Sequence, residues 1–341
     1  MTATSPSPAE HASASEPETA RQTAAVVYNP IKVDLDAIKT AVGRHEFSNG
    51  WAPTTFYETS KEDPGGEVTK QALAEGVDMV IAAGGDGTVR AVAEALQGTD
   101  ASLALLPSGT GNLLARNLEL SLDNLDDSIA TAFSGRDRDI DLGVVDVERE
   151  DGSRETKAFV VMAGVGLDAK MLANTNDELK KRVGWLAYVD AIARALRDDN
   201  KIDVRYELDD QGRKSMRAHT IIVGNCGLLP ANIMLLPDAA IDDGIFDIVA
   251  LRPEGFFGWV QIWVKIVWEN GVMRRTQVGR RILAANSREV RTLRYNKGKK
   301  LVVRLDSPQD FEIDGDSVGK VVALRAVVDP GGLTVRVPAD A

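Results

Sequence analysis

Residues 80–90 read VIAAGGDGTVR, an apolar strand pattern that runs directly into three glycines and one carboxylate. The stretches 24–30 (AAVVYNP) and 101–109 (ASLALLPSG) are also short and almost continuously apolar, as strands covered on both faces of a sheet are. Helical patterns separate these stretches, at 33–42, 66–76 and 88–98. This alternation predicts an α/β domain with a parallel sheet over residues 23–140.

Beyond residue 140 the pattern changes to alternating polar and apolar residues around turn signals such as DDQG (209–212) and NKG (296–298). We expect a β-rich, antiparallel, sandwich-like domain over 141–341, interrupted by one helix at 177–199, and its last strands could return to the first domain. Residues 1–22 contain no aromatic or β-branched aliphatic residue, so we expect a disordered tail.

Composition excludes several classes of protein. No apolar run among the 341 residues approaches the ~20 that a membrane span needs. The single cysteine, Cys226, excludes intramolecular disulfides and favours a cytoplasmic protein. The net charge of −11 argues against general nucleic-acid binding, and the three scattered histidines make a zinc site improbable.

The glycine-rich turn at 84–88 exposes backbone N–H groups at a helix start, which favours bound phosphate. Residues 107–117 (PSGTGNLLARN) form a second such turn after the next strand. Neither turn matches a P-loop or a dinucleotide fingerprint. Asp86 would repel phosphate unless a divalent cation lies between them or it handles a proton; alternatively, it caps the helix that begins near Thr88.

The ordered set YNP (28–30), GGDGT (84–88) and PSGTGNLLARN (107–117) resembles the diacylglycerol kinase catalytic-domain family, which includes sphingosine kinases and bacterial lipid kinases. The blocks GVGLDA (164–169), IDDGIFDIV (241–249) and EIDGD (312–316) extend the resemblance. It implies a nucleotide domain, a β-rich domain and a cleft for Mg²⁺, ATP and lipid between them. The ATP-binding candidates are Asn29, Thr59, Gly84, Gly85, Asp86, Gly87, Thr88 and Thr110.

The resemblance also implies catalytic acids. The family's late block is usually Asp-Gly-Glu, whose acids take the proton of the lipid hydroxyl, whereas this chain has Asp314-Gly315-Asp316. The catalytic candidates are therefore Asp314, Asp316 and Asp86. Without the resemblance, Asp-Gly would be read as a hairpin turn.

A separate metal site, which the resemblance places at the DDG block, would use Asp243 and the carbonyl of Ile245. The third ligand position falls on Ala240, which has no carboxylate, so Asp242 or Asp238 would have to substitute.

Membrane contact is predicted for residues 256–268 (FFGWVQIWVKIVW), which are too short to cross a bilayer as a helix but rich in aromatic residues. A basic segment follows, including Arg274, Arg275, Arg280 and Arg281, which suits an anionic membrane surface. The alternative is a core helix beside a solvated strand face.

We therefore expect an ATP- and Mg²⁺-dependent lipid kinase of phospholipid metabolism, acting on diacylglycerol to form phosphatidic acid. It would be cytoplasmic, peripheral at the inner membrane surface, without a nucleic-acid partner, and open to homodimer formation. The alternatives are a kinase of sphingosine, another long-chain base or another lipid, an NAD kinase, and a non-catalytic regulator that binds nucleotide or lipid.

Overall fold

The computed structural model describes residues 21–166, 201–229, 233–252 and 293–340. Four parallel strands form the sheet of its first part, in the order β4 (Ser102–Pro107), β3 (Met79–Gly84), β1 (Ala24–Tyr28), β2 (Thr55–Glu58). Every residue of β1 and β3 is buried, which explains why these strands are apolar without a break. β2 has partly exposed residues and lies at the edge of the sheet.

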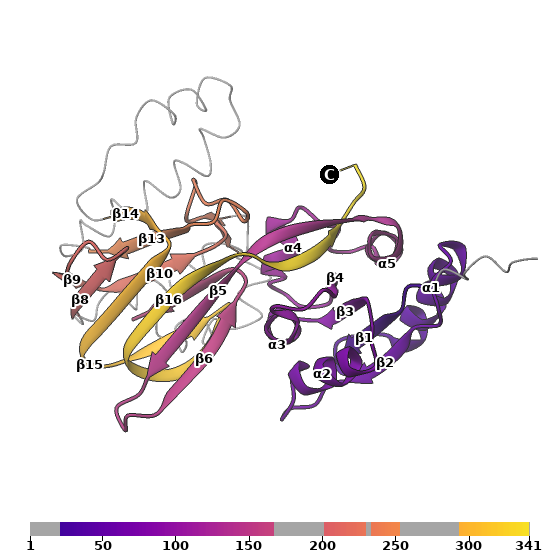
Figure 1. Ribbon diagram of the computed structural model, residues 1–341, viewed down its shortest axis with the longest axis horizontal. Helices are drawn as coiled ribbons and strands as arrows, with labels where there is room; N and C mark the ends of the chain where they lie inside the picture. The colour runs from indigo at the N-terminus through magenta and orange to yellow at the C-terminus, as the bar shows by residue number, and fades with distance from the viewer. Residues whose placement is uncertain (1–20, 167–200, 230–232, 253–292, 341) are drawn as a thin grey trace, which may run out of the picture.

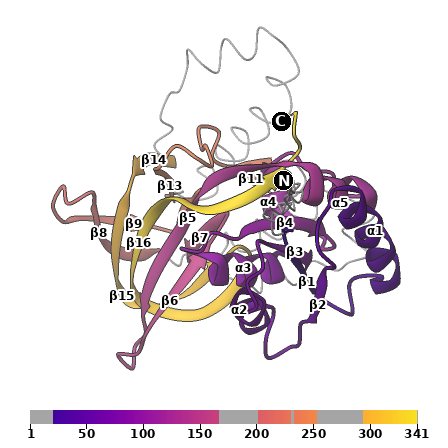
Figure 2. The ribbon, with the colours of Figure 1, turned by 45° about the vertical axis from the view of Figure 1, so that its right-hand side comes forward.

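Helices cover both faces of this sheet (Figures 1 and 2). Residues of α1 (Leu35–Ser48) and α5 (Leu125–Ser134) pack on one face in a core that contains Val26 and Ile81. α2 (Gly66–Ala74) and α3 (Asp86–Leu96) contact each other on the other face, where the core contains Val27 and Ala82. Neighbouring strand residues thus point to opposite cores, and the predicted doubly covered parallel sheet is confirmed.

The second part is antiparallel and β-rich, as predicted. Its longer strands are β5 (Arg136–Glu148), β6 (Arg154–Phe159), β7 (Met162–Val165), β8 (Ile202–Leu208), β9 (Lys214–Ala218), β10 (Thr220–Gly224), β13 (Phe246–Leu251), β14 (Leu293–Gly298), β15 (Lys300–Ile313) and β16 (Asp316–Val337). The short strands β11 (Leu228–Leu229) and β12 (Ile233–Met234) pair with each other.

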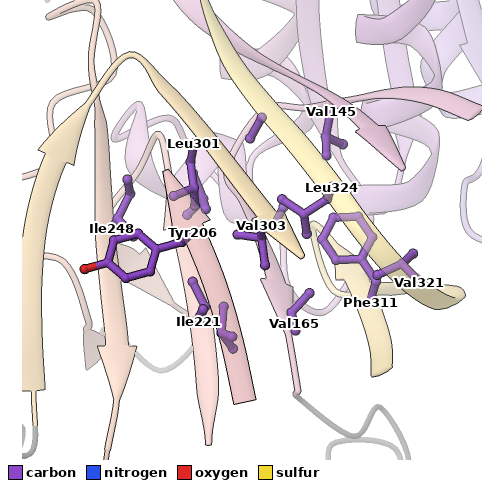
Figure 3. Close-up of a cluster of buried hydrophobic side chains, with 14 of the residues drawn as sticks. Val145, Val165, Tyr206, Ile221, Ile248, Leu301, Val303, Phe311, Val321 and Leu324 are labelled. Atoms are coloured by element: carbon purple, nitrogen blue, oxygen red, sulfur yellow. The ribbon is translucent and has the colours of Figure 1, made fainter. Parts of the chain in front are cut away.

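The bent sheet of this part encloses a hydrophobic core of its own (Figure 3). Alternate residues of β8, such as Val204 and Tyr206, face this core, and so do Val165, Phe311 and Leu324 from other strands. The alternation in the sequence therefore reports which side of each strand is buried.

β5 and β16 run side by side through both parts of the molecule (Figure 1). Ile140 belongs to the core of the α/β part, whereas Val145, on the same strand, belongs to the β-rich core. At the far end of β16, Val335 pairs in parallel with Leu103 of β4. The boundary predicted between residues 140 and 141 therefore falls inside a continuous strand.

Several predicted features lie outside the described residues. They are nearly all of the tail predicted at 1–22, the helix at 177–199, the aromatic-rich segment 256–268, and Arg274, Arg275, Arg280 and Arg281. Within the described ranges, none of the helices is long and apolar enough to cross a membrane.

Candidate active site

The carboxyl ends of the parallel strands bring the predicted nucleotide loops together. The backbone N–H of Asn29, after β1, donates to the carbonyl of Ala83 at 2.9 Å, and that of Ser108, after β4, donates to Gly84 at 3.0 Å. The N–H of Thr59, after β2, donates to Tyr28 at 2.9 Å. In the strand order β4-β3-β1-β2, the chain passes from β1 outward to β2 at one edge of the sheet and from β3 outward to β4 in the opposite direction. In open α/β sheets ligands bind where the strand order reverses in this way, so a ligand crevice is expected at the carboxyl ends of β1 and β3.

Glycines allow the two glycine-rich loops to touch. A Cβ on Gly109 would stand 2.8 Å from the Cα of Gly85, and a Cβ on Gly84 would stand 2.6 Å from Oγ1 of the buried Thr88. Gly85 is the N-cap of α3 and provides no side-chain hydrogen bond to the helix. The first N–H groups of α3 therefore lack a side-chain cap, which suits an anionic ligand. The exposed Thr110 lies in the second loop.

Asp86 joins the two loops. Its Oδ1 accepts from the backbone N–H of Leu113 at 2.6 Å, and its Oδ2 accepts from that of Asn112 at 3.0 Å. Leu113 begins α4 (Leu113–Asn117), so Asp86 satisfies donors at the start of a neighbouring helix. The alternative that it caps its own helix is wrong, because Asp86 is the first residue of α3 and Gly85 is the N-cap.

Two cations, Lys32 and Arg116, lie at these loops. Nζ of Lys32 lies 2.7 Å from the point where a Cβ on Gly85 would stand. Arg116 donates from Nε to the carbonyl of Gly111 at 2.6 Å. Lys32 and Ser108 also line a cavity of about 260 Å³ between the first turns of α1 and α5. We call the two glycine-rich loops, 84–88 and 107–111, together with Lys32 and Arg116 the phosphate cradle. The cradle combines unhindered backbone N–H groups with positive charge.

The DGD block is a hairpin turn and also carries two acids. Asp314 and Gly315 connect β15 to β16 with φ angles of 50° and 89°, the left-handed pair that a two-residue hairpin requires. The two interpretations of this block, as a turn and as a pair of acids, are thus compatible. The turn points the two carboxylates to different surroundings.

Asp314 is buried in backbone hydrogen bonds. Its Oδ2 accepts from the N–H of Val160, and its Oδ1 accepts from those of Val161 and Met162, all at 2.9 Å. Burial raises the pKa of Asp314 to about 6, against the opposing effects of these three N–H groups and of the Arg90 charge. These bonds occupy both oxygens, so the carboxylate holds the 160–162 backbone against the hairpin.

Asp316 faces the phosphate cradle instead. Its side chain is 50% exposed, and its Oδ2 accepts from Nη2 of Arg90 at 3.2 Å. The same oxygen lies 2.9 Å from the point where a Cβ on Gly87 would stand. Of the two acids in this block, Asp316 is therefore the one beside the first turn of α3.

Of the residues predicted to bind metal, Asp242 is held by Arg138 of β5, and Asp243 and Ile245 are hydrogen-bonded to each other. Both Nε and Nη2 of Arg138 donate to Oδ2 of Asp242, at 3.1 and 2.6 Å. Oδ1 of Asp243 accepts from the N–H of Ile245 at 3.2 Å. Within the described ranges, no three His, Cys, Asp or Glu side chains are grouped as metal ligands. The metal site at Asp242, Asp243 and Ile245 stays a prediction.

Sequence reasoning missed Lys32, Arg90 and Arg116 as members of this site. Lys32 lies three residues after Asn29, and Arg90 lies one helical turn after Asp86. A basic residue just beyond a glycine-rich turn is the signal that could have identified Arg90 and Arg116, whereas Lys32 follows a turn without glycine. The pairing of Arg90 with Asp316 had no such signal, because 226 positions separate the two residues.

Comparisons with known proteins agree with this architecture. Residues 23–145 match the model of the diacylglycerol kinase catalytic domain, and residues 160–337 match that of the YegS C-terminal NAD kinase beta sandwich-like domain. A Pseudomonas aeruginosa protein named "Probable lipid kinase YegS-like" is 31% identical over 280 residues, which cover 80% of each chain. A Bacillus subtilis diacylglycerol kinase is 26% identical over 246 residues, covering 70% of this chain and 77% of the relative.

Solved structures share the fold. A crystal structure of a diacylglycerol kinase from Bacillus anthracis has a TM-score of 0.66 at 18% identity and covers 93% of this chain and 96% of its own. A second Bacillus anthracis structure has a TM-score of 0.72 at 20% identity, with coverage of 95% and 99%. At these identities the likeness is one of fold.

Proposed function

The chain belongs to the diacylglycerol kinase catalytic-domain family of lipid kinases, and from this premise we propose that it transfers the γ-phosphoryl group of ATP to the free hydroxyl of diacylglycerol. The observation that carries the proposal is the position of Asp316, a half-exposed carboxylate beside the first turn of α3. This position would bring a proton acceptor next to bound phosphate.

The cradle would bind the triphosphate. The uncapped N–H groups at the start of α3, the closely packed loops around Gly85 and Gly109, and the ammonium of Lys32 all favour anionic oxygens. Mg²⁺ would enter with the nucleotide, bound largely by phosphate oxygens, and would neutralise their charge. The protein's own contribution is to position the phosphate chain, which is most of what phosphoryl transfer requires.

Asp316 would act as the base. Its carboxylate takes the proton of the acceptor hydroxyl as the hydroxyl oxygen forms a bond to the γ-phosphorus, and the bond from that phosphorus to the bridging oxygen of ADP breaks. Asp316 then returns the proton to solvent, because half of its side chain is exposed. Asp314 has no part in this step, since backbone N–H groups occupy both of its oxygens.

The names of the matching catalytic domain and of the Bacillus subtilis relative support diacylglycerol as the acceptor. A lipid with two long acyl chains stays in a membrane, so the enzyme would act as a peripheral protein at an anionic membrane surface.

The test is phosphorylation by the purified protein with Mg²⁺ and radiolabelled ATP. Separate reactions would contain vesicles with diacylglycerol, vesicles with a long-chain base, and soluble NAD. We expect labelled phosphatidic acid, and a loss of roughly 10²-fold or more in kcat for Asp316→Asn. The matched control is Asp306→Asn, which removes an exposed partner of Arg205 and should leave turnover unchanged. Label on the long-chain base or on NAD alone would contradict the diacylglycerol assignment.

A further inference from the structure

Arg90 is a cation that the proposed mechanism has not yet used. It lies in α3, one turn beyond the uncapped helix start, and its side chain is only 16% exposed. One hydrogen bond to Asp316, at 3.2 Å, is long for a bond between charged groups. The charge of Arg90 also acts on Asp314, whose pKa it lowers against the effect of burial.

The guanidinium of Arg90 is incompletely bonded. Its Nε is buried and has no hydrogen-bond partner among the described residues. A buried donor without a partner is destabilising, so a ligand that accepts from it is favoured. Nε and Nη2 form one edge of the planar fork, which matches two oxygens of a carboxylate or a phosphate. In this structure Asp316 contacts only the Nη2 end of that edge.

The Nη2 end of this edge lies beside the first turn of α3, through its contact with Asp316. Oδ2 of Asp316, which accepts from Arg90, also abuts Gly87 in the first turn of α3. Gly87 and Arg90 are three residues apart on a helix, so they lie on the same face. A phosphoryl group at the helix start and an acceptor hydroxyl at Asp316 would therefore both lie beside Arg90.

We propose that Arg90 is a catalytic residue that Asp316 and the transferred phosphoryl group share. The proposal rests on the proposed function. Before transfer, the guanidinium holds Asp316 aimed at the acceptor hydroxyl. As Asp316 takes the proton and becomes neutral, its hold on Nη2 weakens, and oxygens of the phosphoryl group take the Nε–Nη2 edge. Nothing else is exchanged in this step, because the guanidinium remains charged throughout.

Two substitutions test the proposal in the full-length chain. Arg90→Gln removes the charge, and Arg90→Lys keeps the charge but removes the fork. With diacylglycerol vesicles, Arg90→Gln should lower kcat by about 10²–10³-fold, because a preorganised donor at the transferred group is lost. The KM for ATP should stay within about threefold, and Arg90→Lys should recover less than about tenfold, because a lysine cannot replace a bidentate contact.

A binding measurement separates catalysis from structural support. Calorimetry would compare Mg²⁺–ADP with Mg²⁺–ADP plus aluminium fluoride, which mimics the transferring phosphoryl group. We expect the fluoride to increase the affinity of the wild type by at least about tenfold. Arg90→Gln should lose this gain while its affinity for ADP alone is unchanged. Arg325→Gln is the matched control, because Arg325 forms a half-exposed pair with Asp146 on β5.

The outcomes are distinct. If Arg90→Gln keeps kcat within about threefold of the wild type, or retains the fluoride gain, Arg90 is not catalytic although the proposed function stands. If the wild type shows no gain with fluoride, the phosphoryl contact is overturned. If the wild type neither binds ADP nor phosphorylates a lipid, the proposed function itself fails, and this inference fails with it.

Discussion

Two aspartates that are two positions apart have different environments because a left-handed turn lies between them. Asp314 is buried and accepts three backbone N–H groups, whereas the carboxylate of Asp316 lies beside Gly87 in the first turn of α3. The role of each acid therefore follows from its hydrogen bonds rather than from the Asp-Gly-Asp sequence alone. This makes Asp314 a residue whose ionisation should be measurable in the stability of the fold.

The first residue-scale prediction concerns the pH dependence of that stability. Burial raises the pKa of Asp314 from 3.8 to about 6, so its contribution to stability is full below about pH 4 and is lost as pH rises through 6. Asp314→Asn cannot titrate. The difference in the free energy of unfolding between the wild type and this variant should therefore fall by about 2 kcal/mol between pH 4 and pH 7.

Urea unfolding at several pH values measures this difference, and Asp151→Asn is the control. Hydrogen bonds from Ser153 lower the pKa of the exposed Asp151, so for that pair the wild type loses stability relative to the variant only as pH falls below about 4, and the difference should change little between pH 4 and pH 7. A difference for Asp314→Asn that stays constant from pH 4 to pH 7 would contradict the role assigned to its burial.

At the scale of elements, local sequence predicted β1, β3, β4 and the loops that follow β3 and β4, but it missed the partly exposed edge strand β2. The sequences of β1, β3 and β4 are apolar because helices cover both faces of the sheet. Each buried position requires an apolar residue by itself, so the strands can be recognised from local sequence. The contact of Asp86 with Asn112 and Leu113 could not be predicted in this way, because it depends on how two loops approach. The Arg90–Asp316 pair depends on a hairpin that arrives from the other end of the chain.

The loop–loop contact gives a prediction of its own. In Gly109→Ala the new methyl group would meet the Cα of Gly85 at 2.8 Å, and backbone has no rotamer with which to yield. We expect the two loops to separate, with at least tenfold weaker binding of Mg²⁺–ADP by calorimetry and a loss of about 1–3 kcal/mol in stability.

Gly43→Ala is the matched control, because Gly43 lies inside α1 with no atom within 4 Å of the added Cβ. This variant should be more stable by about 0.5–1 kcal/mol and should bind ADP normally. If Gly109→Ala binds ADP as tightly as the wild type, the close approach of the loops has no role in nucleotide binding.

At the scale of the whole molecule, β5 and β16 make the two parts interdependent. The end of β16 supplies Leu333, Val335 and Val337 to the core beneath the nucleotide loops, and each is almost fully buried. Burying an aliphatic side chain contributes about 1.5–3 kcal/mol, so these three together approach the net stability of a typical domain.

Removing residues 333–341 should therefore unfold the α/β part and abolish nucleotide binding. Circular dichroism would measure the loss of helix, and limited proteolysis would show whether the region 23–135 is cleaved before the rest of the chain. Removing only residues 338–341, which follow β16, is the control and should leave the melting temperature unchanged. A shortened chain that still binds ADP and melts like the wild type would show that β4 does not need its C-terminal neighbour.

The return of β16 to β4 also bears on how the protein is made. On the ribosome, β4 emerges long before its neighbour β16, and until then its outer edge offers unpaired N–H and C=O groups to other chains. Domains usually complete folding in the order of synthesis, but here the first domain waits for the last strand. A ribosome that stalls or terminates early would therefore release a chain with an open sheet edge, which is a target for chaperones and proteases rather than a partly working kinase.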